Sequence, residues 1–498
     1  MAGYFESTSV TFGSYTLNNA MPDTADMFLV KYDANGNVLW AKSAGGINTD
    51  IATSVTVDPS GNVLVTGTFS SDSIVFGSYT LTNTTTANYG DVFLVKYDTG
   101  GNVLWARSAG GRYQDEATSV DTDTLGNIAV SGFFLADSMI VGPDTLLNSG
   151  NYDMFVAKYD AGGNALWARR AGGSNDDRGY AVTTDLAGNV IVAGAFLSGS
   201  IIIGTDTLNY AGGAYTDIFL AKYNANGNPV WAESAGGTYL DEPNSVTTDA
   251  SGNIYMTGIV YSSSIIIGTD TLANSGSSFY CEMFIAKYDA GGNPIWADNA
   301  GAPSNNDIAY SVAADVAGNV YVSGVYGNPI TFGTVTLSGG GIFVVKYDGT
   351  GTALWAIGVP GGGGNGIVLD ASGDIYVAGS IYSATITFGS TTLNNAGQYD
   401  MYVAKLSIST GTAETGSVPV CMVYPNPFSQ YATLQFENPQ HIPCTLRLFD
   451  SKGRLVRTTT NITTEKTEID RADLSSGLYF FQLQDGNKVR ASGKLLVE

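Results

Sequence analysis

The hydrophobic and polar positions of this chain alternate in short runs rich in Val, Ile, Phe, Tyr and Thr, and clusters of Gly, Asn and Asp separate the runs. Such runs predict β-strands joined by tight turns. One unit carries four of them, at 53–57, 63–69, 92–98 and 103–108. A weaker piece between the second and third runs predicts a small excursion on the rim. No helical periodicity interrupts the pattern, so we expect an all-β fold.

The unit repeats about every 64 residues. Its register is marked by Trp40, Trp105, Trp167, Trp231, Trp296 and Trp355, with spacings of 65, 62, 64, 65 and 59. A fixed period of this length, built from short strands, is typical of a β-propeller in which each repeat forms one four-stranded blade.

Counting strands gives the number of blades. The third-strand motif, exemplified by 91–98, occurs seven times, whereas the tryptophan strand and the first strand each occur six times. We therefore predict a seven-bladed propeller over residues 1–406. Its first blade starts one strand late, and its last blade, 367–406, lacks the tryptophan strand. Because these two ends do not complement each other, the sequence leaves open how the ring closes.

The turns follow the pattern Asp-x-x-Gly-Asn, as in 33–37 and 98–102. This spacing predicts a three-residue hairpin loop whose glycine is left-handed and whose aspartate accepts hydrogen bonds from turn amides. If Asp33 faces Asn37, then Val30 faces Trp40. Positive φ is expected at Gly36, Gly61, Gly101, Gly126 and Gly188.

The repeat resembles the bacterial β-propeller repeat family of secreted proteins. Two motifs carry the resemblance, Phe-(Val/Leu)-(Ala/Val)-Lys-Tyr-Asp and Gly-Asn-(Val/Ile)-Tyr-Val-(Thr/Ser/Ala)-Gly. The resemblance covers residues 1–406. It implies the fold much more than any activity, because propellers carry many unrelated functions.

A different region follows the repeats. Residues 407–422 form a linker rich in small residues, and residues 423–498 read as about 75 residues of short strands, which suit a small immunoglobulin-like sandwich. This tail resembles the type A C-terminal sorting domain of type IX secretion cargo, through the phrases at 424–427, 448–455, 474–479 and 493–497. The residues that carry the resemblance are Pro425, Asn426, Pro427, Gly453, Gly477, Tyr479 and Lys494.

The resemblance of the tail implies export across the outer membrane of a Gram-negative bacterium, with the secretion and tail-cleaving machinery as partners. The expected location is secreted or on the outer cell surface. Met1 and the residues after it lack a signal-peptide pattern, and the late start of the first blade favours further sequence upstream. No apolar stretch approaches the roughly 20 residues that span a membrane.

The net charge limits which classes of partner the protein can bind. Of the net charge of −23, residues 423–498 contribute +1 and the remaining 422 residues −24. An acidic propeller argues against nucleic acid and anionic membrane surfaces as partners, and permits a cationic ligand. Three cysteines say little about the compartment: Cys421 and Cys444 could bridge, and Cys281 is expected to be an unpaired thiol.

Catalytic motifs are scarce. The single histidine, His441, lies in the tail, so the propeller has no histidine base, nucleophile–histidine pair or histidine metal ligand. No Gly-x-Ser-x-Gly or phosphate-binding motif occurs. Glutamates are few and occupy no constant repeat position. We expect no catalytic residue and no cofactor.

Two repeated features have competing interpretations. The tryptophans could stack on sugars, but equal placement in every blade favours packing between blades. Five aspartates precede the first strand at one fixed offset, where they either cap a loop or hold a divalent cation such as calcium around the channel mouth. They are Asp50, Asp115, Asp177, Asp241 and Asp307.

The leading hypothesis is a secreted or surface-displayed propeller that acts as a non-enzymatic recognition or scaffold module, with a glycan or a protein as its ligand. The alternatives are a secreted polysaccharide-active enzyme with its site on one propeller face, and a structural module of a larger surface protein. A deep pocket with two or three non-repeated carboxylates would favour the enzyme.

Overall fold

The computed structural model describes residues 1–497 except 86–87, 136, 277–278, 328, 371, 407–421, 425, 437, 439–440, 451–453, 473 and 486–487. The chain divides into two compact units, Met1–Ser409 and Thr410–Glu498. All regular elements of the described residues are β-strands. Residues 407–421 of the predicted linker lie outside the described residues.

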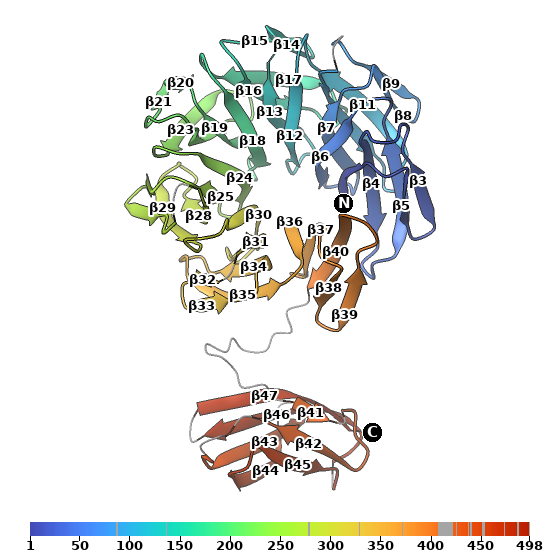
Figure 1. Cartoon of the computed structure of the whole chain (residues 1–498), viewed down its shortest axis with the longest axis vertical. Helices are drawn as coiled ribbons and strands as arrows, with labels where there is room; N and C mark the ends of the chain where they lie inside the picture. Colours follow the sequence, from blue (N-terminus) through green and yellow to red (C-terminus); the bar gives the residue numbers. More distant parts are fainter. Residues whose placement is uncertain are drawn as a thin grey trace. The chain divides into compact units, whose positions relative to one another are not determined.

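The first unit consists of seven radial sheets, blades 1 to 7, arranged around a centre (Figure 1). In each complete blade four strands run antiparallel in chain order, so that the first strand is innermost and the fourth outermost. The first strands are β6 (Asp50–Val57), β12 (Asp115–Thr122), β18 (Asp177–Thr184), β24 (Asp241–Thr248), β30 (Ile308–Ala314) and β36 (Gly362–Leu369).

The second strands are β1 (Ala2–Phe5), β7 (Val63–Phe69), β13 (Ile128–Phe134), β19 (Val190–Phe196), β25 (Ile254–Val260), β31 (Val320–Tyr326) and β37 (Ile375–Ile381). The third strands are β4 (Asp26–Tyr32), β10 (Asp91–Tyr97), β16 (Asp153–Tyr159), β22 (Asp217–Tyr223), β28 (Glu282–Tyr288), β34 (Gly341–Tyr347) and β40 (Asp400–Leu406). The fourth strands are β5 (Val38–Ala44), β11 (Val103–Ala109), β17 (Ala165–Ala171), β23 (Pro229–Ala235), β29 (Pro294–Ala300) and β35 (Ala353–Val359).

The expected rim excursion is a two-stranded hairpin in every blade. These hairpins are β2 (Ser9–Phe12) with β3 (Tyr15–Asn18), β8 (Ser73–Phe76) with β9 (Tyr79–Thr82), β14 (Ser138–Val141) with β15 (Asp144–Leu147), β20 (Ser200–Ile203) with β21 (Asp206–Asn209), β26 (Ser264–Ile267) with β27 (Asp270–Ala273), β32 (Ile330–Phe332) with β33 (Val335–Leu337), and β38 (Thr385–Phe388) with β39 (Thr391–Asn394).

The predicted seven-bladed propeller is confirmed, including its two incomplete ends. Blade 1 is the sheet β1-β4-β5 and blade 7 is the sheet β36-β37-β40. The first and last blades lie side by side (Figure 1), and Met401 of β40 packs against the apolar cluster of Phe5, Phe28 and Val30. The ring therefore closes through side-chain packing between blades 7 and 1.

One predicted register was wrong. Lys31, and not Val30, pairs with Trp40, while Tyr32 pairs with Val38, and the register shifts between Lys31 and Tyr32. The five other third-fourth pairs shift at the same place. A β-bulge of one extra residue moves the tryptophan to the opposite side of the sheet. Each tryptophan thus faces the next blade.

The second unit is a sandwich of two sheets, in the orders β41-β42-β45 and β44-β43-β46-β47. Its strands are β41 (Met422–Tyr424), β42 (Tyr431–Gln435), β43 (Cys444–Asp450), β44 (Leu455–Ile462), β45 (Lys466–Asp470), β46 (Gly477–Asp485) and β47 (Lys488–Val497). Alternate residues of both sheets, such as Leu434, Leu446 and Leu483, meet in one buried core.

Candidate functional site

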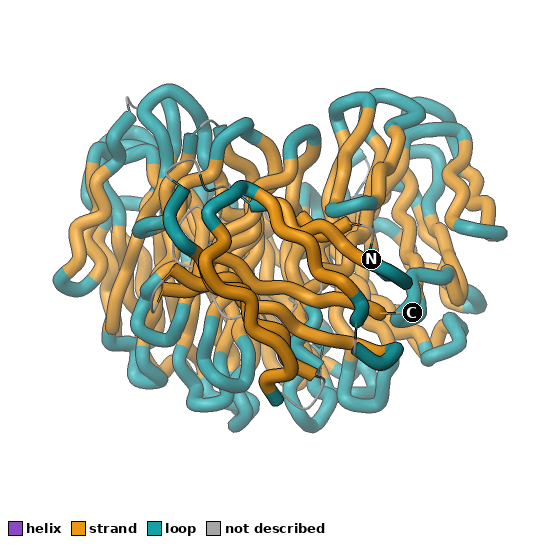
Figure 2. The backbone as a smooth tube through the Cα atoms, turned by 90° about the horizontal axis from the view of Figure 1, so that it is seen from below, coloured by secondary structure: helices purple, strands orange, loops and turns teal. Residues whose placement is uncertain are grey.

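The blades have two different ends, and loops gather at both (Figure 2). The turn end carries the Asp-x-x-Gly-Asn turns, which join the first strand to the second and the third to the fourth. The loop end carries the segments that lead into the first and third strands. Because every blade runs in the same direction, each end collects equivalent residues from all blades.

The turns have the predicted structure. Asp123 accepts hydrogen bonds on Oδ1 from the amides of Leu125 and Asn127, at 3.0 and 2.9 Å, and on Oδ2 from the Asn127 side chain at 2.9 Å. Gly126 has φ of 78°, and Gly36, Gly61, Gly101 and Gly188 also have positive φ, as expected. The turn aspartates are therefore engaged in holding the hairpins.

A third-strand lysine reaches the first turn of each of several blades. Lys158 Nζ lies 2.9 Å from Asp123 Oδ2, and the two side chains are 2% and 1% exposed. Although burial opposes its ionisation, hydrogen bonds from Asn127 and Lys158 lower the pKa of Asp123. Equivalent pairs are Lys96–Asp58, Lys222–Asp185 and Lys346–Asp315, whereas Lys405 pairs with Asp374, which takes the place of the turn asparagine in blade 7.

The five predicted channel-mouth aspartates lie at the loop end. Four of them are the first residues of their strands, whereas Asp307 immediately precedes β30, and all five side chains are fully buried. Asp177 accepts hydrogen bonds from the Gly173 amide at 2.7 Å and the Ser198 hydroxyl at 2.6 Å. Asp50 makes the same two contacts with Gly46 and Ser71. These geometries are those of loop-capping carboxylates.

Each of these aspartates also lies beside the acid that begins the third strand of the preceding blade. The acidic pairs are Asp26 with Asp50, Asp91 with Asp115, Asp153 with Asp177, Asp217 with Asp241, and Glu282 with Asp307. Burial, with the neighbouring Asp91 as a smaller cause, raises the pKa of Asp115 to about 8. Burial likewise raises the pKa of Asp217 to about 7 and of Asp241 to about 6.

The acidic pairs are tightly enclosed. A side chain at Gly110 would collide with the carboxylate of Asp91, which explains the glycine after the tryptophan strand. Asp115 Oδ1 is buried and has no hydrogen-bond partner among the described residues. No three metal-ligating side chains gather within the part of the chain that the structure describes. Calcium binding at the five aspartates stays an untested alternative to loop capping.

The loop end also carries aromatic pairs that the sequence analysis missed. Tyr215 stacks on Tyr239 with ring centroids 5.7 Å apart, and both rings are partly exposed, at 47% and 38%. Tyr89 meets Tyr113 edge-on at 5.7 Å. Phe133 meets Tyr152 at 5.2 Å, and the Arg178 guanidinium lies over both rings. The two tyrosine pairs lie where one blade meets the next, whereas Phe133 and Tyr152 belong to blade 3 and are joined to blade 4 by Arg178 of β18.

Two signals could have revealed this surface. A tyrosine stands one or two residues before the third strand in five blades, at Tyr89, Tyr152, Tyr215, Tyr280 and Tyr399. The loop that carries it also has no constant length, since it comprises 83–90, 148–152, 210–216, 274–281 and 338–340 in blades 2 to 6. These lengths account for nearly all of the unequal tryptophan spacing. The repeat is therefore fixed in its strands and variable in this loop.

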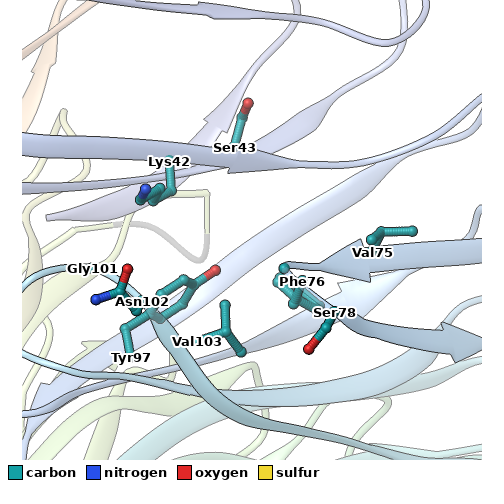
Figure 3. A pocket seen from close by; sticks show the side chains of 10 residues that line it. Lys42, Ser43, Val75, Phe76, Ser78, Tyr97, Gly101, Asn102 and Val103 are labelled. Carbon is teal, nitrogen blue, oxygen red and sulfur yellow. The ribbon is translucent and has the colours of Figure 1, made fainter.

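Two grooves lie on the rim of the propeller. One of about 310 Å³ lies between blades 1 and 2 and is lined by Lys42, Phe76, Tyr97 and Val103 (Figure 3). Another of the same volume lies between blades 4 and 5, beside Asp217 and Ile265. Neither groove has two adjacent exposed carboxylates of the kind that glycoside hydrolysis requires.

The tryptophans pack between blades, as the sequence analysis favoured. Trp40 of blade 1 stacks on Tyr97 of blade 2 with ring centroids 6.2 Å apart, and its Nε1 donates a hydrogen bond to the Thr99 carbonyl at 3.1 Å. Trp40, Trp105 and Trp167 are between 5% and 7% exposed. They are therefore unavailable for stacking on sugars.

The sorting residues of the second unit meet at its final strand. The side-chain amide of Asn426 donates to the Lys494 carbonyl at 2.9 Å, and its Oδ1 accepts from the Leu496 amide at 2.8 Å. Pro427 follows Asn426, and Phe428 pairs in parallel with Val497. The start of the tail is therefore bonded to its end. Gly477 begins β46, whereas Pro425 and Gly453 lie outside the described residues.

The remaining candidates have structural contacts. Tyr479 is buried and donates a hydrogen bond to the Ser475 carbonyl at 3.0 Å. His441 Nδ1 lies 2.9 Å from the Thr463 carbonyl within the sandwich. Cys281 and Cys444 are buried free thiols, whereas Cys421 lies outside the described residues. No helix of the described residues has the length and apolar character needed to cross a membrane.

Residues 422–498 match the family described as the secretion system C-terminal sorting domain. The chain is similar to an uncharacterized WD repeat-containing protein of Acanthamoeba polyphaga mimivirus, at 30% identity over 76% of this chain and 33% of that protein. It is also similar to the regulatory protein FlaEY of Caulobacter vibrioides, at 26% identity over 65% of this chain and 32% of that protein. The chain spans about a third of the length of both relatives.

Among solved structures, the extracellular domain of a hybrid two-component system from B. thetaiotaomicron aligns at 10% identity over 94% of this chain and 61% of that chain, with a TM-score of 0.30. Because that TM-score is low, the propeller architecture is inferred from the arrangement of the sheets in this chain and not from the alignment. The sorting domain makes the chain a secreted or cell-surface protein, addressed to the type IX secretion machinery.

Proposed function

We propose that the propeller is a non-enzymatic recognition module whose binding surface is the loop end, presented outside the cell by the sorting domain. The observation that carries the proposal is the aromatic surface of two tyrosine pairs at blade junctions and of the Phe133–Tyr152 pair that Arg178 of the next blade covers. Rigid, partly exposed tyrosines supply contact area at a small loss of conformational entropy, which is why they are enriched in binding surfaces. Their loops vary while the strands beneath them stay constant.

The absence of catalysis is supported by how the recurring acids are used. Asp123 and its equivalents hold turns and lysines, and Asp177 and its equivalents cap loops. A catalytic carboxylate must instead be free to approach a reacting group. No specific observation favours the polysaccharide-active enzyme.

The net charge of the propeller limits the chemical class of ligand that its surface can bind. A surface on a domain of net charge −23 (residues 1–406) repels polyanions, so the ligand is neutral or cationic. Stacked tyrosines such as Tyr215 and Tyr239 offer flat apolar faces with polar rims, which suit the rings of an uncharged glycan. A protein ligand is the second candidate and would use the same rings as anchors.

The test is to compare binding of the wild-type protein and a Tyr215→Ala/Tyr239→Ala variant to an array of neutral glycans and to intact cells. We expect the variant to lose at least about 10-fold in affinity, about 1.4 kcal/mol. Ile202→Ala, which removes an apolar side chain that is 63% exposed on the rim, is the matched control. Equal binding by both variants would refute the surface, and release of sugar ends from a polysaccharide would refute the non-enzymatic role.

Export is tested separately. A reporter fused to residues 412–498 is expected to reach the cell surface or the medium, because the sorting domain forms a compact unit. Removal of residues 493–498 deletes the strand segment that Asn426 binds, and should retain the reporter in the periplasm. Surface display of the propeller without the tail would contradict this assignment.

A further inference from the structure

The two sheets of the sorting domain differ in the faces that they turn away from their shared core. In a sandwich the inner faces are apolar, and the outward positions between them are normally polar. The three-stranded sheet follows this rule, because the outward positions of β42 and β45 are polar except for one tyrosine. These positions are Tyr431, Thr433, Gln435, Lys466, Glu468 and Asp470. The four-stranded sheet departs from the rule.

An apolar surface, here called the outer patch, occupies one end of the outer face of the four-stranded sheet. Phe449 of β43 pairs with Leu455 of β44 on one side and with Phe480 of β46 on the other. Leu478 lies two residues before Phe480 in β46 and pairs with Leu496 of β47. Because paired residues, and residues two positions apart in one strand, point to the same face, these five side chains are neighbours.

The side chains of the outer patch are accessible. Leu455, Leu478 and Leu496 are 53%, 41% and 43% exposed, and Phe449 and Phe480 are half-buried. Single exposed apolar residues are common on protein surfaces, whereas a contiguous group of them indicates a surface that binds another molecule.

The outer patch is built from the phrases that make the tail resemble sorting domains. Four of its five members belong to the phrases at 448–455, 474–479 and 493–497, and Phe480 directly follows the second of these. The phrases also contain buried residues, such as Leu448, which the core of the sandwich requires. The core does not require the exposed members. Contact with a molecule outside the domain accounts for them.

Basic side chains flank the outer patch. Lys494 pairs with Phe480, and Arg447 pairs with Gln482, which lies two residues after Phe480 in β46. Both basic residues therefore lie on the face that carries the patch, and both are exposed. An apolar surface with a basic edge is complementary to a protein surface that is apolar at its centre and acidic at its rim.

We propose that the outer patch is the surface through which the sorting domain binds the type IX secretion machinery, and that the machinery offers it an apolar surface with an acidic rim. The proposal rests on the assignment of residues 422–498 as a sorting domain. It does not depend on the ligand of the propeller.

Two other occupants fit the charges less well. A symmetric contact between two copies brings the Lys494 and Arg447 side chains of one copy towards those of the other, and like charges repel. An anionic membrane attracts these two residues but repels the propeller of the same chain, whose net charge is −23 (residues 1–406). A protein of the secretion machinery meets neither difficulty.

The experiment follows export of the full-length chain, placed behind a periplasmic signal peptide, in a Gram-negative bacterium that has a type IX secretion system. Leu478→Thr/Phe480→Thr removes two apolar side chains from the outer patch and keeps residue types that favour strands. We expect the exported fraction to fall at least about 10-fold, with the variant retained in the periplasm. Tyr431→Thr is the matched control, because it removes a ring that is 52% exposed on the other outer face, and should be exported as the wild type is.

A charge reversal tests the basic edge without altering the apolar side chains. Lys494→Glu is expected to lower the exported fraction at least about 3-fold, because it repels an acidic rim. Lys466→Glu makes the same change on the other outer face and should leave export unchanged. Both lysines are exposed, so both variants should unfold at the temperature of the wild type. This pair decides the matter if Leu478→Thr/Phe480→Thr lowers the unfolding temperature of the purified protein.

The outcomes separate the proposal from the assignment beneath it. A wild-type chain that is not exported would contradict the sorting assignment itself. Normal export of the wild type and of a folded Leu478→Thr/Phe480→Thr variant would overturn the proposal alone, and normal export of Lys494→Glu would overturn the acidic rim. A dimer in light scattering, or binding to anionic vesicles, that the variant loses while its export stays normal would assign the outer patch to a second copy or to a membrane.

Discussion

At the turn end of the propeller a buried aspartate faces a lysine, whereas at the loop end a buried aspartate faces another acid. Asp123 and Asp115 are both almost fully buried, yet the pKa of Asp123 is lowered and that of Asp115 is raised to about 8. Burial favours the neutral form of both. Only Asp123 has a cation and several hydrogen-bond donors, and together they outweigh the effect of burial. The comparison shows that the partner of a buried acid, not its burial, decides its ionisation.

The largest expected effect comes from removing the cation at the turn end. Lys158→Met leaves the buried Asp123 carboxylate unpaired, so unfolding in urea at pH 7 should show a loss of about 3 to 5 kcal/mol. Lys31→Met is the matched control, because Lys31 is more exposed and its ammonium donates to the Thr99 carbonyl at 3.1 Å, with no carboxylate partner among the described residues. A loss below about 1 kcal/mol at both positions would mean that the buried ion pair of Lys158 and Asp123 adds no stability beyond the packing of the lysine side chain.

The two ends should also give opposite pH dependences. The acids of the loop end have raised pKa values, at about 6 for Asp91 and about 8 for Asp115. Their contribution to the free energy of unfolding is therefore present at low pH and is lost as pH rises from about 4 to 8. The acids of the turn end have lowered pKa values, so the stability that they contribute is lost as pH falls below about 4. Thermal unfolding across this range should therefore give greatest stability near pH 4 to 5. An optimum at pH 7 or above would contradict the raised pKa values.

A single substitution isolates one acidic pair. Asp115→Asn keeps an oxygen that can accept the hydrogen bond of the Gly111 amide but removes the charge beside Asp91. We expect the variant to be about 1 kcal/mol more stable than the wild type at pH 8 and no more stable at pH 4. Chemical denaturation at the two pH values measures the difference. The same gain at both values would show that the titration of Asp115 is not its cause.

The smallest expected effect concerns calcium. The donors around Asp177 and Asp241 come from serine hydroxyls and backbone amides, and they point at the carboxylate oxygens that a cation would need. We therefore expect neither heat in calorimetric titration with calcium nor a shift of the unfolding midpoint. Binding that Asp115→Asn with Asp241→Asn abolishes would restore the cation hypothesis.

The sequence predicted those features that depend on neighbouring residues. The hairpin turns follow from Asp, Gly and Asn within five positions, as in 123–127, and the blade count follows from motifs that recur once per repeat. The register of Trp40 was missed because the bulge beside Leu39 adds a residue without a compositional signal. The acidic pairs and the tyrosine pairs were missed because their members, such as Asp91 with Asp115 or Tyr215 with Tyr239, come from different blades and meet only when the ring forms.

The loop before each third strand has a consequence for protein engineering. It comprises three residues at 338–340 and eight at 83–90, while the strands on either side keep their pairing. It is therefore a grafting position at which new sequence can be inserted without moving the frame. A library randomised in these loops of several blades at once would present its variable segments side by side, as the loops of an antibody do.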